Sequence, residues 1–432
     1  MTDTGASGWR AGPSYSNYVL FVLFLGYVTN SLDRGILGIL MPPIQAEFRL
    51  SYTQVGLLGG LAFALFYATL GIPIASVADR TSRKWVLAVC MALWSAMTAL
   101  CGLVGSFPQL VGARVGTAIG EAGGSPPSVS LITDYFPTRR RGTALSLYAL
   151  GASAGASAAF LFGGIGNDLW GWRIVFVLAG IPGLVVALLV VFTVREPARG
   201  MADGVSIAAA PRGNPFAALP HLWKCAAFRH MALAAAMHAF VVYGAAGFNQ
   251  LFLAQTHHMS TSAIGAWGSG FTLLGALGTF IGGYACDWLA ARHGDQRFYL
   301  WVPGVAVLMG IPFQMLGYLS PTIPLALTGF AGSIFFASFF FGPGFAMAQA
   351  LAPPNRRAVS ASVLLFIQTM IGLGLGPLVA GKIADELKQP FGNHALGYAL
   401  ALVSLVNLWS ALHYWLAGRT VRADIEQAKT EA

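Results

Sequence analysis

Charged residues are scarce in this sequence. Only 9% of its 432 residues are charged and 56% are hydrophobic, whereas soluble domains carry about 25% charged residues. The composition therefore excludes an ordinary soluble domain and predicts a membrane protein.

Several motifs are also absent. The sequence contains no Walker sequence and no HExxH motif, so ATP-driven transport is not supported. No nucleophile and base accompany its few charges at a workable spacing, and we expect neither an enzyme, a cofactor nor a metal site. The adjacent His257 and His258 fall in a predicted loop, where a solvated pair is expected. The four cysteines form no CxxC pair and are expected to be free thiols: Cys90, Cys101, Cys225 and Cys286.

Long apolar runs fill most of the chain. A spanning helix needs about 20 apolar residues, and breaks at glycine, proline and charged residues divide the chain into twelve segments of that size. The first is too long for the apolar region of a signal peptide and no small-residue cleavage site follows it, so we expect it to remain as a helix. The twelve predicted membrane helices are 18–41, 53–78, 84–105, 109–133, 141–166, 172–194, 229–254, 261–288, 298–319, 322–350, 357–384 and 394–418.

The net charge of +9 has a topological explanation. Basic residues gather in every second connection and in the C-terminal tail, and the other connections hold little beyond Arg49, Arg173 and Lys388. By the positive-inside rule both termini are cytoplasmic, and nucleic acid is not an expected partner. The basic positions that set this topology include Arg80, Arg83, Lys84, Arg139, Arg140, Arg141, Arg195, Arg199, Arg212, Lys224, Arg229, Arg292, Arg297, Arg356, Arg357, Arg419, Arg422 and Lys429.

The two halves of the chain resemble each other. The stretch 137–144 (PTRRRGTA) aligns with 354–361 (PNRRAVSA), and the same offset of 217 carries Gly164 onto Gly381 and Asp168 onto Asp385. Two repeated halves of six helices are typical of secondary transporters, whose binding site lies at mid-membrane between the halves. We therefore predict an all-α membrane protein built from two pseudo-symmetric six-helix bundles.

The predicted domain boundaries follow from the spans. The bundles are 18–194 and 229–418, the cytoplasmic tails are 1–17 and 419–432, and the linker is 195–228. Apolar residues recur at helical spacing near the end of the linker, which predicts either a short interfacial helix or an ordinary linker.

At these residues the chain resembles the major facilitator superfamily. The loop signature Gly-x-x-x-Asp-Arg-x-Gly-Arg-Arg/Lys appears as 75–84 (ASVADRTSRK), with Ala75 and Ser82 in place of its two glycines. The chain is most similar to the spinster-like branch, at 30–34 (NSLDR), 43–48 (PIQAEF), 79–84 (DRTSRK) and 120–122 (GEA) followed by 134–137 (DYFP). That branch exports lysolipids and sphingoid phosphates. The resemblance therefore implies a lipid-like substrate, a monomer, and a central cavity lined by the first and fourth helices.

Four charged residues fall in the interior of predicted spans, away from the span ends: Asp33 and Arg34 in 18–41, and Arg114 and Glu121 in 109–133. A charge near the bilayer centre costs about 2.5–3.5 kcal/mol on insertion scales, so such residues mark a functional site by default. The alternative is a static network that only fixes helix packing. At about 1.5 Å per residue, Asp33 and Arg114 lie at the same depth. We predict that Asp33 pairs with Arg114 and that Arg34 reaches toward Glu121.

The residue types suggest a role for each charge. Arg34 and Arg114 are candidates for holding an anionic head group, because a guanidinium offers a planar fork to phosphate or carboxylate. Asp33 and Glu121 are candidate proton carriers, and Glu121 is also a candidate substrate-site residue. In this hypothesis, protonation of Glu121 frees Arg34 for substrate and ionisation of Glu121 reclaims it.

The second half carries a different set of residues. The offset of 217 leads from Arg114 and Glu121 to Ala331 and Ser338, so the tenth helix lacks charges there. It is instead rich in phenylalanine, and a cavity charged on one wall and aromatic on the other suits an amphipathic substrate. The alternative is that the phenylalanines face lipid and that a lone histidine only packs. The candidate substrate contacts in this half are Phe335, Phe336, Phe339, His238 and Tyr243.

A third group of charges lies in the predicted cytoplasmic loops. It comprises Asp79, Arg80, Arg83, Lys84, Asp134 and Arg139. The resemblance implies a gate in which Asp79 and its basic neighbours hold the second helix against the eleventh in the outward-open state. The alternative is simple topological charge.

The sequence thus predicts a secondary active transporter of the inner membrane, coupled to protons, that moves an amphipathic anion such as a lysophospholipid or a sphingoid phosphate. Its expected partners are this substrate, protons and the lipid bilayer. One alternative is a proton symporter of small organic anions such as sugar acids, because such symporters share the Asn-x-x-Asp-Arg first helix and the Gly-Glu-Ala fourth helix. The other is a transporter-shaped receptor or sensor.

Overall fold

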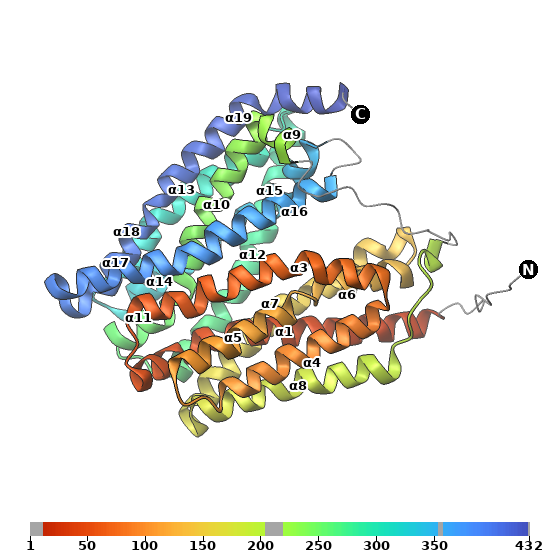
Figure 1. Ribbon diagram of the computed structural model, residues 1–432. Helices are drawn as coiled ribbons and strands as arrows, with labels where there is room; N and C mark the ends of the chain where they lie inside the picture. The colour runs from red at the N-terminus through yellow and green to blue at the C-terminus, as the bar shows by residue number, and fades with distance from the viewer. Residues whose placement is uncertain (1–11, 204–218, 353–356, 431–432) are drawn as a thin grey trace, which may run out of the picture.

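The structure, a computed structural model, describes residues 12–203, 219–352 and 357–430. The secondary structure of these residues is entirely helical. The start of α1 and the end of α19 lie on the same side of the molecule, toward the right in Figure 1. We call this side the termini face and the side at the left the opposite face.

The first half holds α1 to α8. Its elements are α1 Pro13–Phe48, α2 Tyr52–Gly56, the π-helix η1 Leu57–Leu61, α3 Ala62–Arg80, α4 Arg83–Cys101, α5 Phe107–Glu121, α6 Ser125–Tyr135, α7 Thr138–Trp170 and α8 Trp172–Thr193, followed by the 3₁₀ turn η2 Met201–Asp203.

The second half holds α9 to α19. Its elements are α9 Leu219–Lys224, α10 Ala226–Ala246, α11 Asn249–Thr256, α12 Thr261–His293, α13 Phe298–Leu319, α14 Ile323–Ala337, the 3₁₀ turn η4 Ser338–Phe340, α15 Phe341–Ala350, α16 Arg357–Ile367, the π-helix η6 Gln368–Leu375, α17 Gly376–Phe391, the 3₁₀ turn η7 Gly392–His394, α18 Ala395–Ser404 and α19 Val406–Thr430.

The twelve predicted spans all correspond to observed elements. Among the described residues, ten helical runs are long and apolar enough to cross a membrane. The last of these, 359–427, contains two predicted spans separated at η7, and the pair α5–α6 supplies the remaining span, which is broken at 122–124. The ten runs therefore become twelve, in agreement with the predicted all-α membrane fold.

Glycine and proline explain where the spans are interrupted. The break between α5 and α6 falls at Gly123 and Gly124, just before two prolines, and α10 ends before Gly247. The π-helices η1 and η6 contain glycine pairs and pack against each other across the two halves, where a Cβ on Gly60 would lie 2.7 Å from the carbonyl oxygen of Leu373. Interruptions of this kind are frequent at functional sites.

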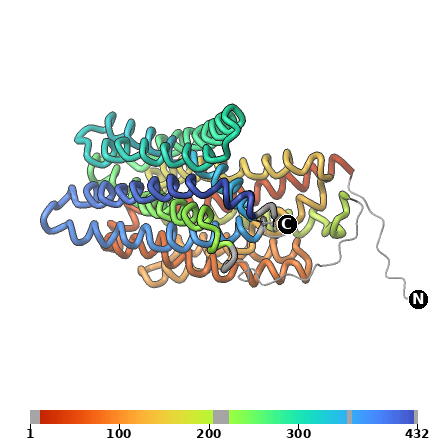
Figure 2. Tube along the Cα trace, turned by 90° about the horizontal axis from the view of Figure 1, so that it is seen from above, coloured from red at the N-terminus to blue at the C-terminus, as the bar shows by residue number. Residues whose placement is uncertain are grey.

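The halves meet at the opposite face. Figure 1 shows their helices converging there and diverging toward the termini face. A single apolar cluster at this end joins Ile36 to Ile44 of α1 with Phe248 to Leu253 of the second half, whereas the clusters nearer the termini face each belong to one half. Figure 2 shows the helices of both halves running in the same general direction, between the two faces.

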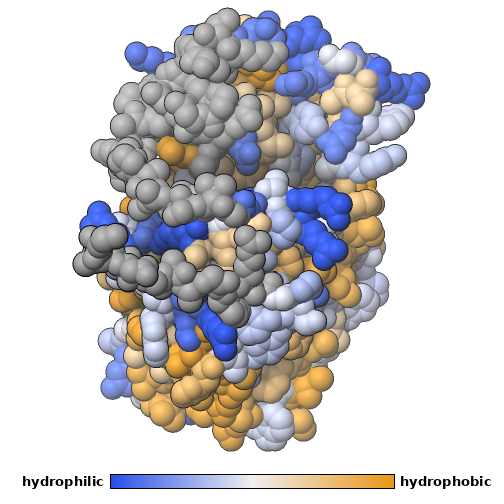
Figure 3. All heavy atoms as spheres, turned by 90° about the vertical axis from the view of Figure 1, so that its right-hand side faces the viewer, coloured by the Kyte–Doolittle hydropathy of each residue, from blue (hydrophilic) through white to orange (hydrophobic). Residues whose placement is uncertain are grey.

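The surface agrees with a membrane location. Large apolar side chains are exposed along the flanks, among them Phe192 and Phe280. Viewed onto the termini face, hydrophilic atoms gather across the upper and middle parts, and apolar atoms dominate the lower part and the right-hand edge (Figure 3). Lipid tails solvate such apolar flanks, while water meets the polar face.

One boundary differs from the prediction. The last helix does not end at 418 but continues to Thr430, because Val421 and Ile425, four residues apart, are buried against the second half. Of the predicted interfacial helix, the structure describes α9, whose Leu222 is buried in the core of the second half. Its position relative to the bilayer stays a prediction, as does the structure of 1–11 and 204–218, which lie outside the described residues.

Candidate functional site

The charged residues predicted in the first and fourth spans are close together in the interior. Arg34 of α1 and Glu121 at the end of α5 form an ion pair through Nε and Oε2, as predicted. The Glu121 side chain is fully buried, whereas 41% of the Arg34 side chain is exposed, on the wall of a cavity. Arg34 can therefore hold Glu121 with one edge of its guanidinium while the rest faces the cavity.

Asp33 has a different partner from the one predicted. It makes no ion pair with Arg114 and accepts a hydrogen bond from the Thr98 hydroxyl of α4 through Oδ1. Its other oxygen, Oδ2, is buried without a hydrogen-bond partner. The reason lies in the helix geometry: adjacent residues diverge by about 100°, so Arg34 faces the cavity while Asp33 is turned toward α4.

Arg114 lines the cavity and has no ionic partner within the part of the chain that the structure describes. Only 3% of the residue is exposed, and Nε and Nη1 of its guanidinium make no hydrogen bond. Buried donors normally have an acceptor, and leaving one unsatisfied costs about 1–3 kcal/mol. Arg114 is thus a buried cation with free donors on a cavity wall, which is what an anion-binding group requires.

An aromatic pair on α3 supports both arginines. The ring of Phe63 lies 5.5 Å from the Cζ of Arg34 and 5.5 Å from the Cζ of Arg114. Tyr67, one turn further along, stacks on Phe63 and lies 4.7 Å from the Cζ of Arg34. Cation–π contacts of this kind contribute about 0.5–2 kcal/mol each. They fix the guanidinium planes without neutralising the charges.

The central cavity has a volume of about 440 Å³, within the range usual for small-molecule sites. It lies between the halves and is bordered by the arginines on one side and by Tyr243, Phe248 and Gln250 on the other. The structure thus places Arg34, Arg114 and Tyr243 on one cavity, as the sequence predicted.

A second cavity of about 250 Å³ adjoins the first. Phe160, Ala246 and Gln250 line both. Its remaining lining is mostly apolar and comes from α7, α10, α11, α12 and α14, with Phe271 and Phe330 as its other aromatic residues. We call it the side cavity.

The predicted phenylalanine wall was placed on the wrong face of its helix. Phe335, Phe336 and Phe339 pack on one another and are not among the residues that line either cavity. Glycines of α12 draw this part of the helix into close contact: a Cβ on Gly282 would lie 2.6 Å from the Cα of Phe339. The aromatic residue of the tenth span that does reach a cavity is Phe330.

His238 also lies away from the cavities. It is 1% exposed, and its ring nitrogens contact the Asn407 side chain at 3.0 Å and the carbonyl oxygen of Ala337 at 2.9 Å. Asn407 in turn donates to Gln314 at 3.1 Å. His238 therefore belongs to a neutral hydrogen-bond network that ties α10, α13, α14 and α19 together, and the geometry gives it a packing role.

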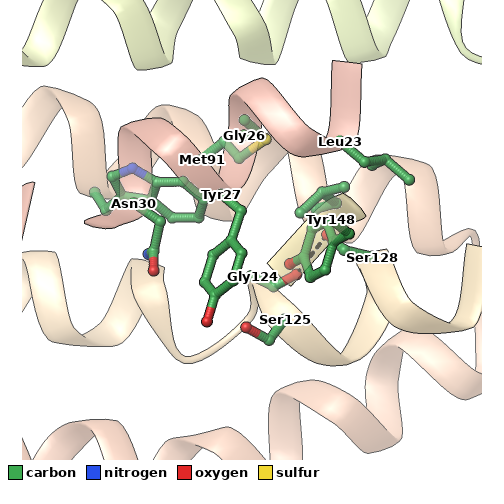
Figure 4. Close-up of a pocket in the computed structure, with 11 residues that line it drawn as sticks. Leu23, Gly26, Tyr27, Asn30, Met91, Gly124, Ser125, Ser128 and Tyr148 are labelled. Atoms are coloured by element: carbon green, nitrogen blue, oxygen red, sulfur yellow. Dashed lines mark hydrogen bonds between the residues drawn. The ribbon is translucent and has the colours of Figure 1, made fainter. Parts of the chain in front are cut away.

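A much smaller cavity lies in the first half beside the α5–α6 break. Its volume of about 10 Å³ has room for roughly one water molecule and none for a substrate. Figure 4 shows Tyr27 extending toward Ser125, with Tyr148 beside Ser128. The amide nitrogen of Asn30, which is among its lining residues, is buried without a partner.

The predicted gate residues form two ionic clusters at the termini face. Arg83 is buried and binds Asp134 and, at 2.8 Å, Glu196, which also accepts from the backbone N–H of Lys84 at 2.8 Å. Asp79 lies 3.7 Å from Arg199. Glu196 and Arg199 follow α8; the sequence pattern indicated only topological charge for Arg199 and no role for Glu196.

The remaining gate residues are exposed. Arg80 and Arg139 point to solvent. The side chains of 353–358, at the start of the eleventh span, lie outside the described residues, so the contact predicted between Asp79 and that span stays a prediction. Within the described residues, no group of three metal-ligating side chains is present.

Three of the newly found residues carry no chemical signal in the sequence. Thr98 is one hydroxyl among many in apolar helices, and only the packing of α4 on α1 reveals its partner. Phe63 and Tyr67 have the helical spacing that permits stacking, but an apolar α3 gives no indication that two arginines lie beside them.

The comparisons with known proteins identify relatives of the chain. The Major Facilitator Superfamily model matches residues 23–244 and again 231–432. An MFS-type efflux pump of Mycolicibacterium smegmatis is 33% identical over 423 residues, which are 97% of each chain. The D-galactonate transporter of Escherichia coli is 25% identical over 433 residues, covering 94% of this chain and 96% of the relative. The sphingosine-1-phosphate transporter of Danio rerio is 25% identical over 410 residues, covering 89% and 80%.

A solved structure agrees with these relatives. It is a bacterial homologue of the human lysosomal transporter Spinster in an inward-facing, unoccupied conformation. It superposes with a TM-score of 0.86 at 33% identity, over 96% of this chain and 99% of that chain.

Proposed function

The chain belongs to the major facilitator superfamily, whose members are transporters and not enzymes, and from this premise we propose that it is a secondary active transporter of an amphipathic anion, coupled to protons. The proposed substrate class is a lysophospholipid or a sphingoid phosphate. Arg34 and Arg114 hold its head group, and Asp33 and Glu121 carry the coupling protons.

The main support for an anionic substrate is the guanidinium of Arg114, which has free hydrogen-bond donors. Its two unpartnered donors lie on the wall of the central cavity, and Phe63 holds it within reach of Arg34. A phosphate placed between the two guanidiniums would accept charge-assisted hydrogen bonds from both. The Arg34–Glu121 pair is neutral overall, so the positive charge that remains is that of Arg114. The negative charge of the substrate then neutralises it.

The side cavity favours a substrate with an apolar tail. It opens from the central cavity at Phe160 and Gln250, and aromatic and aliphatic side chains form most of its wall. A lipid chain buried there gains about 0.8 kcal/mol per methylene. Phe160, Phe271 and Phe330 take the tail-contact role that the sequence analysis gave to Phe335, Phe336 and Phe339.

The Arg34–Glu121 pair couples protons to the anion. While Glu121 is ionised, it occupies one edge of Arg34. When Glu121 takes up a proton, Arg34 loses its counter-charge and gains a donor for the substrate. Proton and anion then favour the same state of the site. Asp33, whose Oδ2 is buried without a partner, is the second carboxyl able to accept a proton there.

The proposed orientation places the termini face in the cytoplasm. Exposed arginines such as Arg80 and Arg139 lie on that face, as the positive-inside rule requires of the cytoplasmic side. The protein is then a multi-pass monomer of the inner membrane with both termini inside. In this orientation the halves are closed on the outer side, the conformation that the matched Spinster homologue is described as having.

Ligand-induced stabilisation of the purified protein tests the substrate class. Lysophosphatidate and sphingosine-1-phosphate should raise its melting temperature at micromolar concentration, while monoacylglycerol of the same chain length, which lacks the anion, should not. The Arg114→Gln variant should lose the shift, and Arg292→Gln, on the exposed end of α12, should keep it. A shift by monoacylglycerol equal to that by lysophosphatidate would contradict the proposal.

A proton symporter of sugar acids is the second candidate, because the D-galactonate transporter is among the relatives. Such a substrate would use the arginines and leave the side cavity unfilled. Galactonate would then stabilise the protein and lysolipids would not. A flux measurement distinguishes a transporter from a receptor that binds without transport. The proposed function requires that a pH gradient drives labelled lysolipid into or out of proteoliposomes.

A further inference from the structure

Asp385 joins the two halves through three hydrogen bonds. It lies near the end of α17, and its carboxylate accepts hydrogen bonds from the backbone N–H groups of Tyr52 at 2.9 Å and Thr53 at 2.8 Å and from the Thr53 hydroxyl at 2.6 Å. Tyr52 and Thr53 are the first two residues of α2 in the other half. A carboxylate at this position satisfies free N–H groups and faces the positive end of the helix dipole.

Asp168 makes the corresponding contact with the roles of the halves exchanged. It lies near the end of α7 in the first half and accepts from the backbone N–H of Ser262 at 2.9 Å, at the start of α12 in the second half. Its neighbour Asn167 donates to the Thr261 hydroxyl at 3.0 Å. Asp168 and Asp385 are the residues that the repeat offset of 217 places on each other, so the two contacts are related by the internal symmetry of the chain.

Both receiving helices begin with similar sequences, 51–56 (SYTQVG) and 260–265 (STSAIG). In each, the serine caps its own helix through the N–H three residues later. The carboxylate from the other half supplies acceptors for N–H groups that this cap leaves free. Such a motif occurs twice, and each copy receives an aspartate from the opposite half.

Glycines bring the helices close enough for these bonds. Gly164 and Gly381 lie one turn before the aspartates, and they too are related by the offset of 217. A Cβ on Gly164 would lie 2.6 Å from the carbonyl oxygen of Thr261, and one on Gly381 would lie 2.6 Å from the carbonyl carbon of Tyr52. Any side chain there would push the helix start away from its aspartate.

These observations lead to one functional assignment, which rests on the proposed alternating-access transport. We propose that Asp168 and Asp385, each seated on a helix start of the other half, form a symmetric latch that holds the opposite face closed, and that both contacts break when the central cavity opens to that face. Asp168 and Asp385 are therefore gating residues of the transport cycle that act at a distance from the substrate.

Distances between spin labels in nanodiscs test the latch. Leu103 of the first half and Gln389 of the second are exposed near the opposite face and serve as one label pair, while Thr81 and His293 near the termini face serve as the other. The labels are introduced after replacement of the four free cysteines. The Asp168→Ala/Asp385→Ala variant should raise the population with a long 103–389 distance and a short 81–293 distance about tenfold.

A second variant acts without removing charge. Gly164→Ala/Gly381→Ala should shift both distance distributions in the same direction as the aspartate variant. Its matched control is Gly142→Ala/Gly270→Ala, on the same two halves, where a Cβ meets nothing within 4 Å. Glu386→Gln, at the exposed neighbour of Asp385, is the control for loss of charge. Neither control should shift the distances.

The outcomes separate the latch from the substrate proposal. If the aspartate and glycine variants elute and melt as folded protein but keep the wild-type distance distributions, the latch is refuted, and Arg114-dependent binding of lysophosphatidate is unaffected by that result. If binding fails while the distances shift, the latch stands and the substrate class falls. A shift in the control variants equal to that in the test variants would also overturn the latch.

Discussion

The two halves share a fold and a sequence repeat but differ in their polar interiors. The first half buries Asp33, Arg114 and Glu121 beside the partly exposed Arg34, and several polar atoms of the three buried residues lack a partner among the described residues. The second half buries His238, Asn407 and Gln314 in a neutral chain of hydrogen bonds. A network in which every polar atom has a hydrogen-bond partner stabilises one arrangement. A charged network with unpartnered atoms instead gains free energy when a ligand or a proton supplies the missing partner. The difference assigns the binding of the anionic head group to the first half and a packing role to the buried polar network of the second half.

Arg114→Gln should produce the largest effect. It removes a buried cation that has no ionic partner to leave behind, so the protein should fold normally. The loss of charge-assisted hydrogen bonds should weaken binding of lysophosphatidate by about 2–3 kcal/mol, or about 30- to 150-fold. Equilibrium binding to the purified variant measures this loss. Wild-type affinity in Arg114→Gln would show that the unsatisfied donors are not the anion site.

His238→Phe should have the opposite effect: it should lower stability and leave binding unchanged. The substitution leaves Asn407 and the carbonyl oxygen of Ala337 without one of their partners, and stability should fall by about 1–3 kcal/mol. Because His238 lies outside both cavities, affinity for lysophosphatidate should not change. Thermal unfolding and binding on the same preparation provide the two readouts. A selective loss of affinity at unchanged melting temperature would move His238 into the binding site.

Phe63→Leu should give a smaller change within the first half. The aliphatic side chain fills space but offers no π face to Arg34 and Arg114, so affinity should fall by about 1 kcal/mol, or about fivefold. Phe336→Leu, in the aromatic cluster outside the cavities, is the matched control and should bind as the wild type. Equal losses in the two variants would remove the special role of the α3 ring.

Asp203→Asn should have the smallest effect. Asp203 lies outside the membrane spans, and the hydrogen bond from Arg141 lowers the pKa of its carboxyl below the usual value. A lowered pKa contributes stability above the pKa of the unfolded chain, and this contribution is lost as the pH falls through the folded value. The variant should therefore melt slightly below the wild type at neutral pH and converge with it in acid. A large drop in melting temperature would show that ion pairs at the surface, as well as those in the interior, distinguish the two halves.

Much of this organisation could be predicted from the sequence because it depends on local signals. The spans follow from apolar runs, and helix spacing together with the expected adjacency of the first and fourth spans was enough to pair Arg34 with Glu121. The repeat that relates Asp168 to Asp385 could also be found from the sequence alone, by aligning its two halves. Their binding to the starts of α2 and α12, however, required the halves to be placed together.

The wrong predictions share a cause. Which face of a helix points to a cavity depends on the neighbours that occupy the other faces. Glycines of α12 bury Phe339, and the nearby Thr98 takes the oxygen of Asp33 that was assigned to Arg114. These contacts join residues more than 50 positions apart and leave no periodic trace. The extension of α19 to Thr430 likewise depends on the surface that receives Val421 and Ile425.

The pH dependence of anion binding in Glu121→Gln tests the central claim most directly. In the wild type, affinity for lysophosphatidate should rise as the pH falls, over the range in which the ligand's own charge is constant, because protonation of Glu121 releases Arg34. The glutamine variant has no carboxylate to release from Arg34, so it should lose the part of the pH dependence that Glu121 supplies, and its affinity should vary less with pH than that of the wild type. The same pH dependence in the variant as in the wild type would contradict the claim that Glu121 and Arg34 couple a proton to the substrate.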